Sequence, residues 1–362
     1  MAFELSPYYP PDFDAPELKN APCARLEAAP MDSVAPEGYH ATSIYPEYFK
    51  VDGKWILAEE SRMDCAPVYE NGKIAVRELR RLKKGDLVIC GRTENGAEGI
   101  YLHNKGFVLP GQETEAFAFR RGHSRETSFS RDYDELYELL KYDREHGKTV
   151  WVMGPAFTFD HDARDAFSRL IANGYVNAVL AGNALAVHDL EGALFGTALG
   201  QNIYTRKNEQ NGHYHHLDTI NRVRACGSIK GFIEAEKIDN GIMFSCEKYG
   251  VPYVLAGSIR DDGPLPDVYP DVYAAQDAMR NVVRDATTVI CMATMLHTIA
   301  VGNMTPSYRV LSDGTVRKLY FYCVDISEFM VNKLSDRGSL SSRGIVTNVQ
   351  DFIVNIANGL GV

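Results

Sequence analysis

Residues 148–182 read KTVWVMGPAFTFDHDARDAFSRLIANGYVNAVLAG, and this stretch decides the fold class. It contains the apolar run KTVWVMG (148–154), the helical pattern DARDAFSRLIANG (162–174) and a second apolar run, YVNAVLAG (175–182). Short, nearly continuous apolar runs are typical of strands that are buried on both faces. A succession of strand, helix and strand therefore predicts parallel strands joined by a crossover helix.

The same alternation continues to the C-terminus. Further apolar runs are VPYVLAG (251–257), TTVICMA (287–293), KLYFYCVD (318–325) and RGIVTNV (343–349). Helical patterns lie between or beside them, at residues 218–235, 271–285 and 326–336. We therefore predict an α/β protein with a parallel, doubly wound sheet that is flanked by helices.

The N-terminal third has a different character. Residues 1–40 are rich in Pro, Ala and acids, which indicates an extended arm. From residue 54 to 91, short β-prone runs alternate with turns, and Asn71-Gly72 is a hairpin signal. We predict an arm and a small β-rich domain over residues 1–120, a polar linker over 121–134, and a catalytic domain over 135–362. The catalytic domain begins in a helix with Leu136, Leu139 and Leu140 on one face.

The composition is that of a globular protein. The chain has 362 residues, of which 45% are hydrophobic and 24% charged. Because domains usually have about 100–200 residues, this length favours two domains.

Residues 1–14 carry acids and prolines where a secretion signal has a basic start and an apolar run. No later stretch approaches the ~20 apolar residues of a membrane span. We expect a cytoplasmic protein without a membrane partner.

The net charge and the cysteine pattern limit the classes of partner and ligand that we expect. The 38 Lys and Arg residues against 48 Asp and Glu residues give a net charge of −10. A surface of that sign repels phosphate backbones, so nucleic acid is not an expected partner, whereas a cationic small molecule is compatible with it. The seven cysteines are scattered without a C-x-x-C motif, which favours neither a disulfide framework nor a zinc knuckle.

Ligands of doubly wound sheets bind outside the carboxyl ends of the strands. Here those ends are small and polar: the residues that follow the predicted strands are 154–156, 182–184, 257–262, 293–297, 325–326 and 348–349. Small residues let the backbone approach a nucleotide, and N–H groups at helix starts can hold its phosphates. Asp325 is placed to bind a ribose diol, which favours NAD over NADP, or else to cap the next helix. The usual G-x-G-x-x-G motif is missing after the first strand.

Polar clusters offer candidate catalytic groups. In Gly212-His213-Tyr214-His215-His216 the His-x-His pair could chelate a transition metal, or the imidazoles could transfer protons. No adjacent acid or cysteine completes a ligand set, so we predict no metal. His188 and His297 could be catalytic or interior histidines. The loop 261–267 holds three carboxylates, Asp261, Asp262 and Asp267, which suit acid/base work or cap a turn and a helix.

Several strings resemble one family. They are AGNALAVHD (181–189), LFGTALG (194–200), GHYHH (212–216), VLAGSIRDDGPLPDV (254–268), ATMLHTIAVGN (293–303) and VDIS (324–327). These resemble the LOR/SDH-type, or archaeal-type, ornithine cyclodeaminases, which also form the C-terminal half of bifunctional arginine-degrading enzymes. Residues 53–74 and 83–91 resemble the LOR/SDH region that precedes the NAD domain. The resemblance covers the chain from about residue 33.

The resemblance implies a deoxyhypusine-synthase-like NAD domain and a recycled cofactor. NAD+ would take hydride from Cα of L-ornithine, the δ-amine would attack the imine and expel ammonia, and NADH would return the hydride to give L-proline. A base must neutralise the amines before each step, and we expect His215, His216 and Asp261 to handle these protons, with Arg260 or Lys230 as the partner of the substrate carboxylate. The implied NAD contacts are Asn183, Ala184, Asp262, Thr294, Met295, Leu296, His297, Asp325, Asn348 and Val349.

Alternatives stay open at this stage. A lysine cyclodeaminase or an amino-acid or imino-acid dehydrogenase could use the same fold, as could a silent NAD-binding regulator, and a metal-dependent hydrolase could centre on residues 212–216. We expect a homo-oligomer. Arginine is not an expected substrate, because no arginine-dihydrolase domain precedes residue 33. One departure from the family is the segment between Pro306 and Val324, which reads as an inserted hairpin with its turn at residues 312–315.

Overall fold

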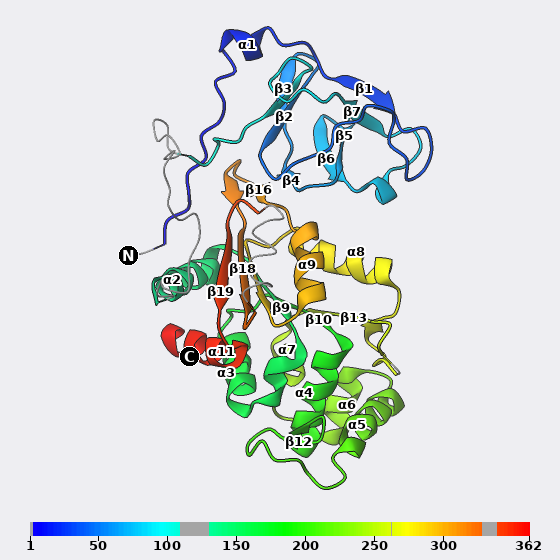
Figure 1. The fold of residues 1–362 in the computed structure, drawn as a ribbon, viewed down its shortest axis with the longest axis vertical. Coiled ribbons are helices and arrows are strands. Elements are labelled where there is room, and N and C mark those ends of the chain that lie inside the picture. Colours follow the sequence, from blue (N-terminus) through cyan, green and yellow to red (C-terminus); the bar gives the residue numbers. More distant parts are fainter. Residues whose placement is uncertain (1–2, 109–129, 262, 328–338) are drawn as a thin grey trace.

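The computed structural model describes residues 3–108, 130–261, 263–327 and 339–362 (Figure 1). Within these residues, seven parallel strands form one sheet in the order β14-β13-β10-β9-β15-β18-β19. The predicted parallel, doubly wound sheet is therefore confirmed. The strands are β9 (Thr149–Met153), β10 (Ala178–Gly182), β13 (Tyr253–Ala256), β14 (Val268–Tyr269), β15 (Thr288–Met292), β18 (Tyr320–Asp325) and β19 (Ser342–Val346).

The central strands are largely apolar because both faces of the sheet are covered. Ile290 of β15 pairs with Trp151 on one side and Tyr322 on the other, and all three side chains are buried in one core. Since successive side chains alternate between faces, Val289 and Phe321 belong to a second core. Burying a large apolar side chain contributes roughly 1.5–3 kcal/mol, so both cores stabilise the same sheet.

Helices cover each face. Helices α2 (Ser130–His146), α3 (His161–Ala172) and α11 (Val349–Leu360) supply side chains to the first core, and α8 (Val272–Val283) and α9 (Met295–Met304) supply the second. The predicted apolar face of α2 is confirmed, because Leu136, Leu139 and Leu140 are all buried. Helices on both faces are what the doubly wound class requires.

A further group of helices lies beyond the carboxyl edge of the sheet, in the lower part of Figure 1. It contains α4 (Asn183–Phe195), α5 (His213–Cys226), α6 (Ile229–Glu236) and α7 (Ile242–Tyr249). Helix α4 starts at the end of β10 and packs against η2 (Pro155–Phe159), the 3-10 helix that follows β9. The helical pattern predicted over 218–235 is confirmed as two helices, because Gly227, with φ of 76°, ends α5 and Ser228 caps α6.

The N-terminal region is β-rich. Its strands are β1 (Arg25–Ala28), β2 (Glu47–Val51), β3 (Lys54–Leu57), β4 (Glu60–Ser61), β5 (Ala66–Glu70), β6 (Lys73–Arg77), β7 (Leu87–Cys90) and β8 (Ile100–Leu102). Asn71-Gly72 forms the predicted hairpin turn, with φ of 51° and 79°. The extended arm predicted for residues 1–40 differs from the structure, because this segment contains α1 (Pro16–Lys19) and β1, which pairs with β7.

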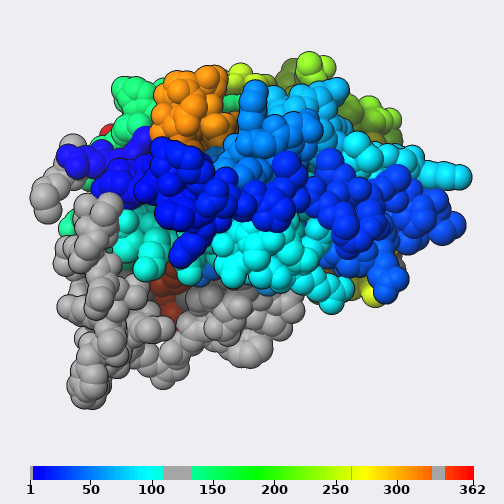
Figure 2. All heavy atoms as spheres, turned by 90° about the horizontal axis from the view of Figure 1, so that it is seen from above, coloured from blue at the N-terminus to red at the C-terminus, as the bar shows by residue number. Residues whose placement is uncertain are grey.

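The predicted insertion is a hairpin of β16 (Tyr308–Val310) and β17 (Val316–Lys318). Strand β16 also pairs with β4 of the N-terminal region, and the buried Tyr308 hydroxyl donates to the carbonyl of Ala58 at 2.8 Å. Because the hairpin immediately precedes β18, its pairing with β4 connects the N-terminal region to the amino edge of the parallel sheet. Figure 2 views this end, where the blue and cyan N-terminal region lies beside orange atoms that belong to the segment around residue 300.

Some predicted segments fall outside the described residues: most of the linker over 121–134, most of the helix over 326–336, and Asp262. The domain limits 1–120 and 135–362 stay predictions. No helix in the described part of the chain is long and apolar enough to cross a membrane.

Candidate active site at the carboxyl edge

The strand order reverses between β9 and β15, and the segments that follow these strands meet at this switch point. The Gly154 N–H donates to the carbonyl of Met292 at 2.8 Å. A Cβ at position 154 would lie 1.9 Å from the Ala293 carbonyl oxygen, so only glycine fits. Ala293 has a left-handed φ of 49°, and such strained residues cluster at functional sites. The switch point is where ligands of this fold class bind.

Two helix N-termini face this edge. Helix α4 begins after Gly182 and α9 begins after Thr294, and neither helix has a side chain that caps its N–H groups. The Thr294 hydroxyl instead lies 3.2 Å from Nδ1 of His297. Met295 and Leu296, in the first turn of α9, are exposed. Uncapped N–H groups at a helix start are suited to hold an anion such as a phosphate group.

His297 lies over the end of β10. A Cβ at Gly182 would be 2.9 Å from Cε1 of His297, so these residues are in contact. Burial lowers the pKa of His297, and the Asp261 carboxylate raises it by a smaller amount. The imidazole is therefore neutral at neutral pH, and it lies near enough to Asp261 for that carboxylate to affect its pKa.

The remaining predicted cofactor residues lie at strand ends or helix starts. Asn183 is buried and its Oδ1 accepts the Leu265 N–H at 3.0 Å, while Ala184 is half-buried in the first turn of α4. Asp325 ends β18 beside Val346, and its Oδ1 accepts the Ser327 N–H at 2.8 Å. A carboxylate has further acceptor sites, so Asp325 can still bind a hydroxyl.

At the end of β19, Asn348 caps α11. Its Oδ1 accepts the Gln350 N–H at 2.8 Å, and the Val349 side chain is buried. A ligand here would therefore contact the Asn348 amide nitrogen or the backbone.

The loop after β13 carries the predicted acids. Asp261 is half-buried and its Oδ2 accepts the Ser258 N–H at 2.8 Å, whereas Arg260 is exposed. Asp267 caps α6 by accepting the Ile229 N–H at 2.7 Å, which supports the capping alternative for this residue. Lys230, the next residue of α6, is exposed. The loop is tied to α5 because Arg224 donates to the Pro264 carbonyl at 3.2 Å.

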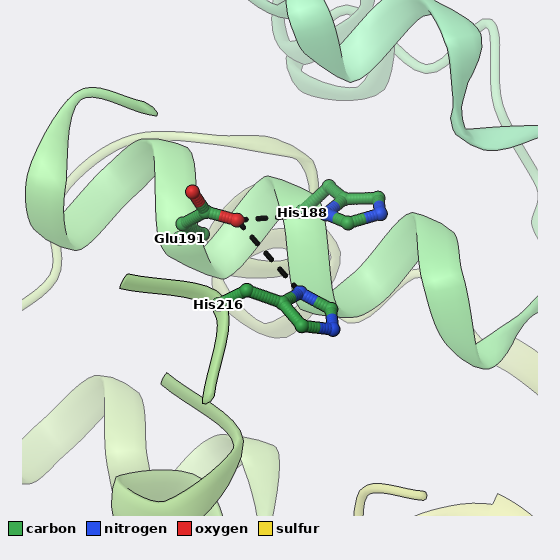
Figure 3. A group of neighbouring side chains, drawn as sticks. All are labelled: His188, Glu191 and His216. Atoms are coloured by element: carbon green, nitrogen blue, oxygen red, sulfur yellow. Dashed lines mark ion pairs between the residues drawn. The ribbon is translucent and has the colours of Figure 1, made fainter. Parts of the chain in front are cut away.

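A second group of titratable residues joins α4 to α5. His188 and Glu191 lie one turn apart on α4, and His216 lies in the first turn of α5 (Figure 3). Oε2 of Glu191 is 3.5 Å from Nδ1 of His188 and 3.9 Å from Nδ1 of His216. Sequence reasoning missed Glu191, although its spacing of three from His188 places both on one helix face.

Glu191 is fully buried and ionised. It accepts hydrogen bonds from the Thr197 hydroxyl at 2.8 Å and from the N–H groups of Leu199 and Gly200 at 2.9 Å. Burial raises the pKa of this carboxyl, but the contact with His188 and these three donors outweigh burial and leave the pKa below its ordinary value. Burial, aided by His188, lowers the pKa of His216, which Glu191 partly opposes.

His215 contacts Thr197, which is one of the hydrogen-bond donors to Glu191. Its Nδ1 is 2.9 Å from the Thr197 hydroxyl, and its ring stacks on Phe195 at 4.5 Å with an interplanar angle of 12°. His213 is exposed and contacts the Tyr214 ring. The His-x-His pair that was considered as a possible chelate, His213 with His215, does not form a group of possible metal ligands among the described residues.

One set of possible metal ligands is present among the described residues: His188, Glu191 and His216, whose ligand atoms lie within 4.8 Å of one another. Two imidazoles and a carboxylate can hold zinc. Of the predicted cluster at residues 212–216, only His216 belongs to this set.

These features define a class: an α/β protein of the Rossmann type whose switch point has the features of a nucleotide-binding site, with a histidine-rich helical layer beside it. Two models of known protein families match this chain. Residues 135–356 match the model described as arginine dihydrolase ArgZ-like, C-terminal, Rossmann fold, and residues 46–125 match the first region of the same C-terminal part. The chain belongs to this ArgZ-like C-terminal family, which includes proteins named ornithine cyclodeaminase.

Two relatives illustrate the range of the family. The ornithine cyclodeaminase of Methanopyrus kandleri is 39% identical over 347 residues, which are 93% of this chain and 78% of the relative. The bifunctional arginine dihydrolase/ornithine cyclodeaminase AgrE of Nostoc is 38% identical over 336 residues, 91% of this chain and 46% of the relative. The predicted resemblance is confirmed.

Solved structures of related proteins are also similar to this chain. A conserved LOR/SDH protein from Methanococcus maripaludis S2 has a TM-score of 0.83 and 37% identity, with coverage of 94% of this chain and 98% of that one. The ternary complex of AgrE with ornithine and NAD+ has a TM-score of 0.58 and 35% identity over 96% of this chain and 47% of that one.

Proposed function

We propose that this protein is an NAD-dependent ornithine cyclodeaminase that converts L-ornithine to L-proline and ammonia. The observation that carries the proposal is the likeness, over 96% of this chain, to AgrE, which has been solved with ornithine and NAD+. The relatives that match most of the chain and are named ornithine cyclodeaminase support the same reaction. The protein would thus act in ornithine and arginine metabolism and in proline synthesis, as a homo-oligomer.

The residues present fit NAD. Gly154 and Gly182 let the strand ends pack closely against Ala293 and His297. The uncapped N-termini of α4 and α9 can receive the phosphates of a nucleotide. Asp325 retains acceptor capacity for a ribose diol at the end of β18. When bound, NAD would supply a hydride acceptor for Cα of ornithine and a hydride donor for the cyclic imine.

The chain's own groups would move protons and hold the substrate. Ornithine arrives with protonated amines, so a neutral base must remove a proton before the amine reacts. His215 and His216, with Asp261, are the candidates, and His216 is held neutral by burial. Arg260 or Lys230 would pair with the substrate carboxylate. Ring closure is intramolecular, with an effective molarity that can reach ~10⁵ M or more, so it competes well with release of the imine.

A product assay tests the proposal against its alternatives. The protein is incubated with ornithine or lysine and a catalytic amount of NAD+, and ammonia, cyclic product and NADH are measured. We expect ammonia and proline in equal amounts from ornithine, with no accumulation of NADH. Preference for lysine would indicate a lysine cyclodeaminase, and NADH in proportion to product would indicate a dehydrogenase. Either result would overturn the proposal.

A further inference from the structure

The buried carboxylate of Glu191 interacts with three histidines, in each case through the Nδ1 atom of the imidazole, either directly or through Thr197. Its Oε2 faces Nδ1 of His188 and of His216, at 3.5 and 3.9 Å. Its Oε1 accepts from the Thr197 hydroxyl, whose oxygen lies 2.9 Å from Nδ1 of His215. Nδ1 of His188 and of His216 therefore faces Glu191 directly, whereas Nδ1 of His215 reaches it only through Thr197. Figure 3 shows Nε2 of His188 and His216 pointing away from Glu191.

The hydrogen bond between Thr197 and His215 has a defined direction. A hydroxyl has one hydrogen, and an ionised carboxylate can only accept. Glu191 is ionised, so the Thr197 hydrogen points at Oε1 of Glu191, 2.8 Å away. The Thr197 oxygen is left as an acceptor, and Nδ1 of His215 must donate to it. A neutral His215 therefore carries its proton on Nδ1 and a lone pair on Nε2.

The same reasoning applies to His188 and His216. Their Nδ1 atoms are buried and have no hydrogen-bond partner at ordinary distance within the described residues. A lone pair on either atom would face the negative Oε2 of Glu191, whereas an N–H would be attracted to it. The Nδ1–H form is therefore favoured, and Nε2 of each ring is left as the basic atom.

We propose that Glu191 is a positioning residue that holds His188, His215 and His216 with the proton on Nδ1, so that each presents Nε2 as the proton acceptor. The use of these Nε2 atoms in turnover rests on the proposed function, but the tautomers themselves do not. Glu191 acts on His215 through Thr197, so the proposal makes Thr197 a second positioning residue.

A metal at this group would demand the opposite arrangement. Coordination by Nδ1 of His188 and His216 needs lone pairs on these atoms and places their protons on Nε2. Metal-binding histidines almost always donate that second N–H to an acceptor. The position of the ring protons therefore separates the two arrangements.

The test uses two substitutions at Thr197, which is fully buried. Thr197→Val keeps the shape and removes the hydroxyl, and Thr197→Ser keeps the hydroxyl. Nitrogen-15 NMR of histidine-labelled full-length protein reports which ring nitrogen is protonated, and His215→Gln assigns the His215 signals. We expect Nδ1–H in the wild type and in Thr197→Ser, and a mixture of tautomers at His215 in Thr197→Val.

Kinetics add a second readout. Thr197→Val should lower kcat by roughly 10²-fold, the lower end of the range for a positioned base, with KM and NAD affinity unchanged, and Thr197→Ser should stay within a few-fold of wild type. A wild-type His215 with its proton on Nε2 would overturn the proposal, as would equal tautomers and equal kcat in both variants. Tight Zn²⁺ binding that is lost in Glu191→Gln would also overturn it. If no variant turns over any diamino acid, the proposed function fails and the NMR result alone decides the tautomers.

Discussion

Gly182 and His297 are in direct contact at the carboxyl edge of the sheet: a Cβ added to Gly182 would lie 2.9 Å from Cε1 of the imidazole. The backbone at Gly182 has φ of −96°, which any residue can adopt. Alanine at position 182 is therefore restricted by the histidine alone. The absence of a side chain at position 182 is therefore what lets His297 pack against the end of β10.

Gly182→Ala should weaken NAD binding by at least about tenfold, because His297, a predicted NAD contact, must move to admit the methyl group. Titration of NAD checks this. In a His297→Ala background, the substitution at position 182 should have no further effect, since the clash is gone. Gly263→Ala is the matched control, because its Cβ would meet nothing closer than 3.7 Å. Wild-type affinity in Gly182→Ala would remove this end of β10 from the site.

Asp325→Arg should abolish most NAD affinity and permit some NADP binding, because it replaces the carboxylate that repels a 2′-phosphate. Titration of both cofactors against wild type and variant gives the result. Asp325 also accepts the Ser327 N–H, so Asp325→Asn is the control that keeps this bond. Unchanged NAD affinity in the arginine variant would leave Asp325 with a capping role alone.

His215→Ala should lower turnover by roughly 10²–10⁴-fold if its imidazole transfers a proton, with folding intact, and the same loss is expected for His216→Ala. His213→Ala is the matched control, because His213 belongs to the same helix start but is exposed. Steady-state kinetics and thermal unfolding are measured together. A lower Tm with normal activity per folded molecule would assign these histidines a structural role.

The free energy of unfolding should fall on mild acidification. Burial lowers the folded-state pKa of His297 and of His216, so the unfolded chain takes up protons first as pH drops. The contribution of these histidines to the free energy of unfolding is therefore complete above their unfolded-state pKa of about 6.5. It is lost as the pH falls toward their lower folded-state pKa values. Urea unfolding at pH 7.5, 6.5 and 5.5 measures the slope. His297→Gln should reduce it, and an identical slope in the variant would contradict the assignment.

The fate of the hydride separates a cyclodeaminase from a dehydrogenase. If the hydride leaves Cα and returns to the ring within one site, ornithine deuterated at Cα should give proline that retains deuterium at Cα. Mass spectrometry of proline formed with catalytic NAD+ measures this. Proline free of deuterium, or label in free NADH in proportion to product, would exclude the closed cycle.

Features that depend on local pattern could be predicted from the sequence. The strand runs, the position of Asp325 at the end of β18, and the hairpin at residues 308–318 each follow from a stretch of a few residues. The break between α5 and α6 had a local signal as well, in Gly227 followed by the capping Ser228.

The histidine network could not be predicted in this way. Glu191 and His216 meet because α4 and α5 pack together, and that packing depends on the turn after Gly196, whose left-handed φ of 70° ends α4. The bond between Thr197 and Glu191 is formed in the same turn. No periodicity in a single segment reports how two helices cross, so the partner of each histidine required the tertiary structure.

The pairing of β4 with β16 has a consequence for synthesis of the chain. The Ser307 hydroxyl donates to the Ser61 carbonyl across 246 residues. At about 5–20 residues per second, ribosomes need roughly 12–50 s to make that interval. During this time β4 lacks its partner strand, and an unpaired strand edge can join a neighbouring chain. The β-rich region therefore completes its packing late in translation, and chains that terminate before residue 308 would be prone to aggregate.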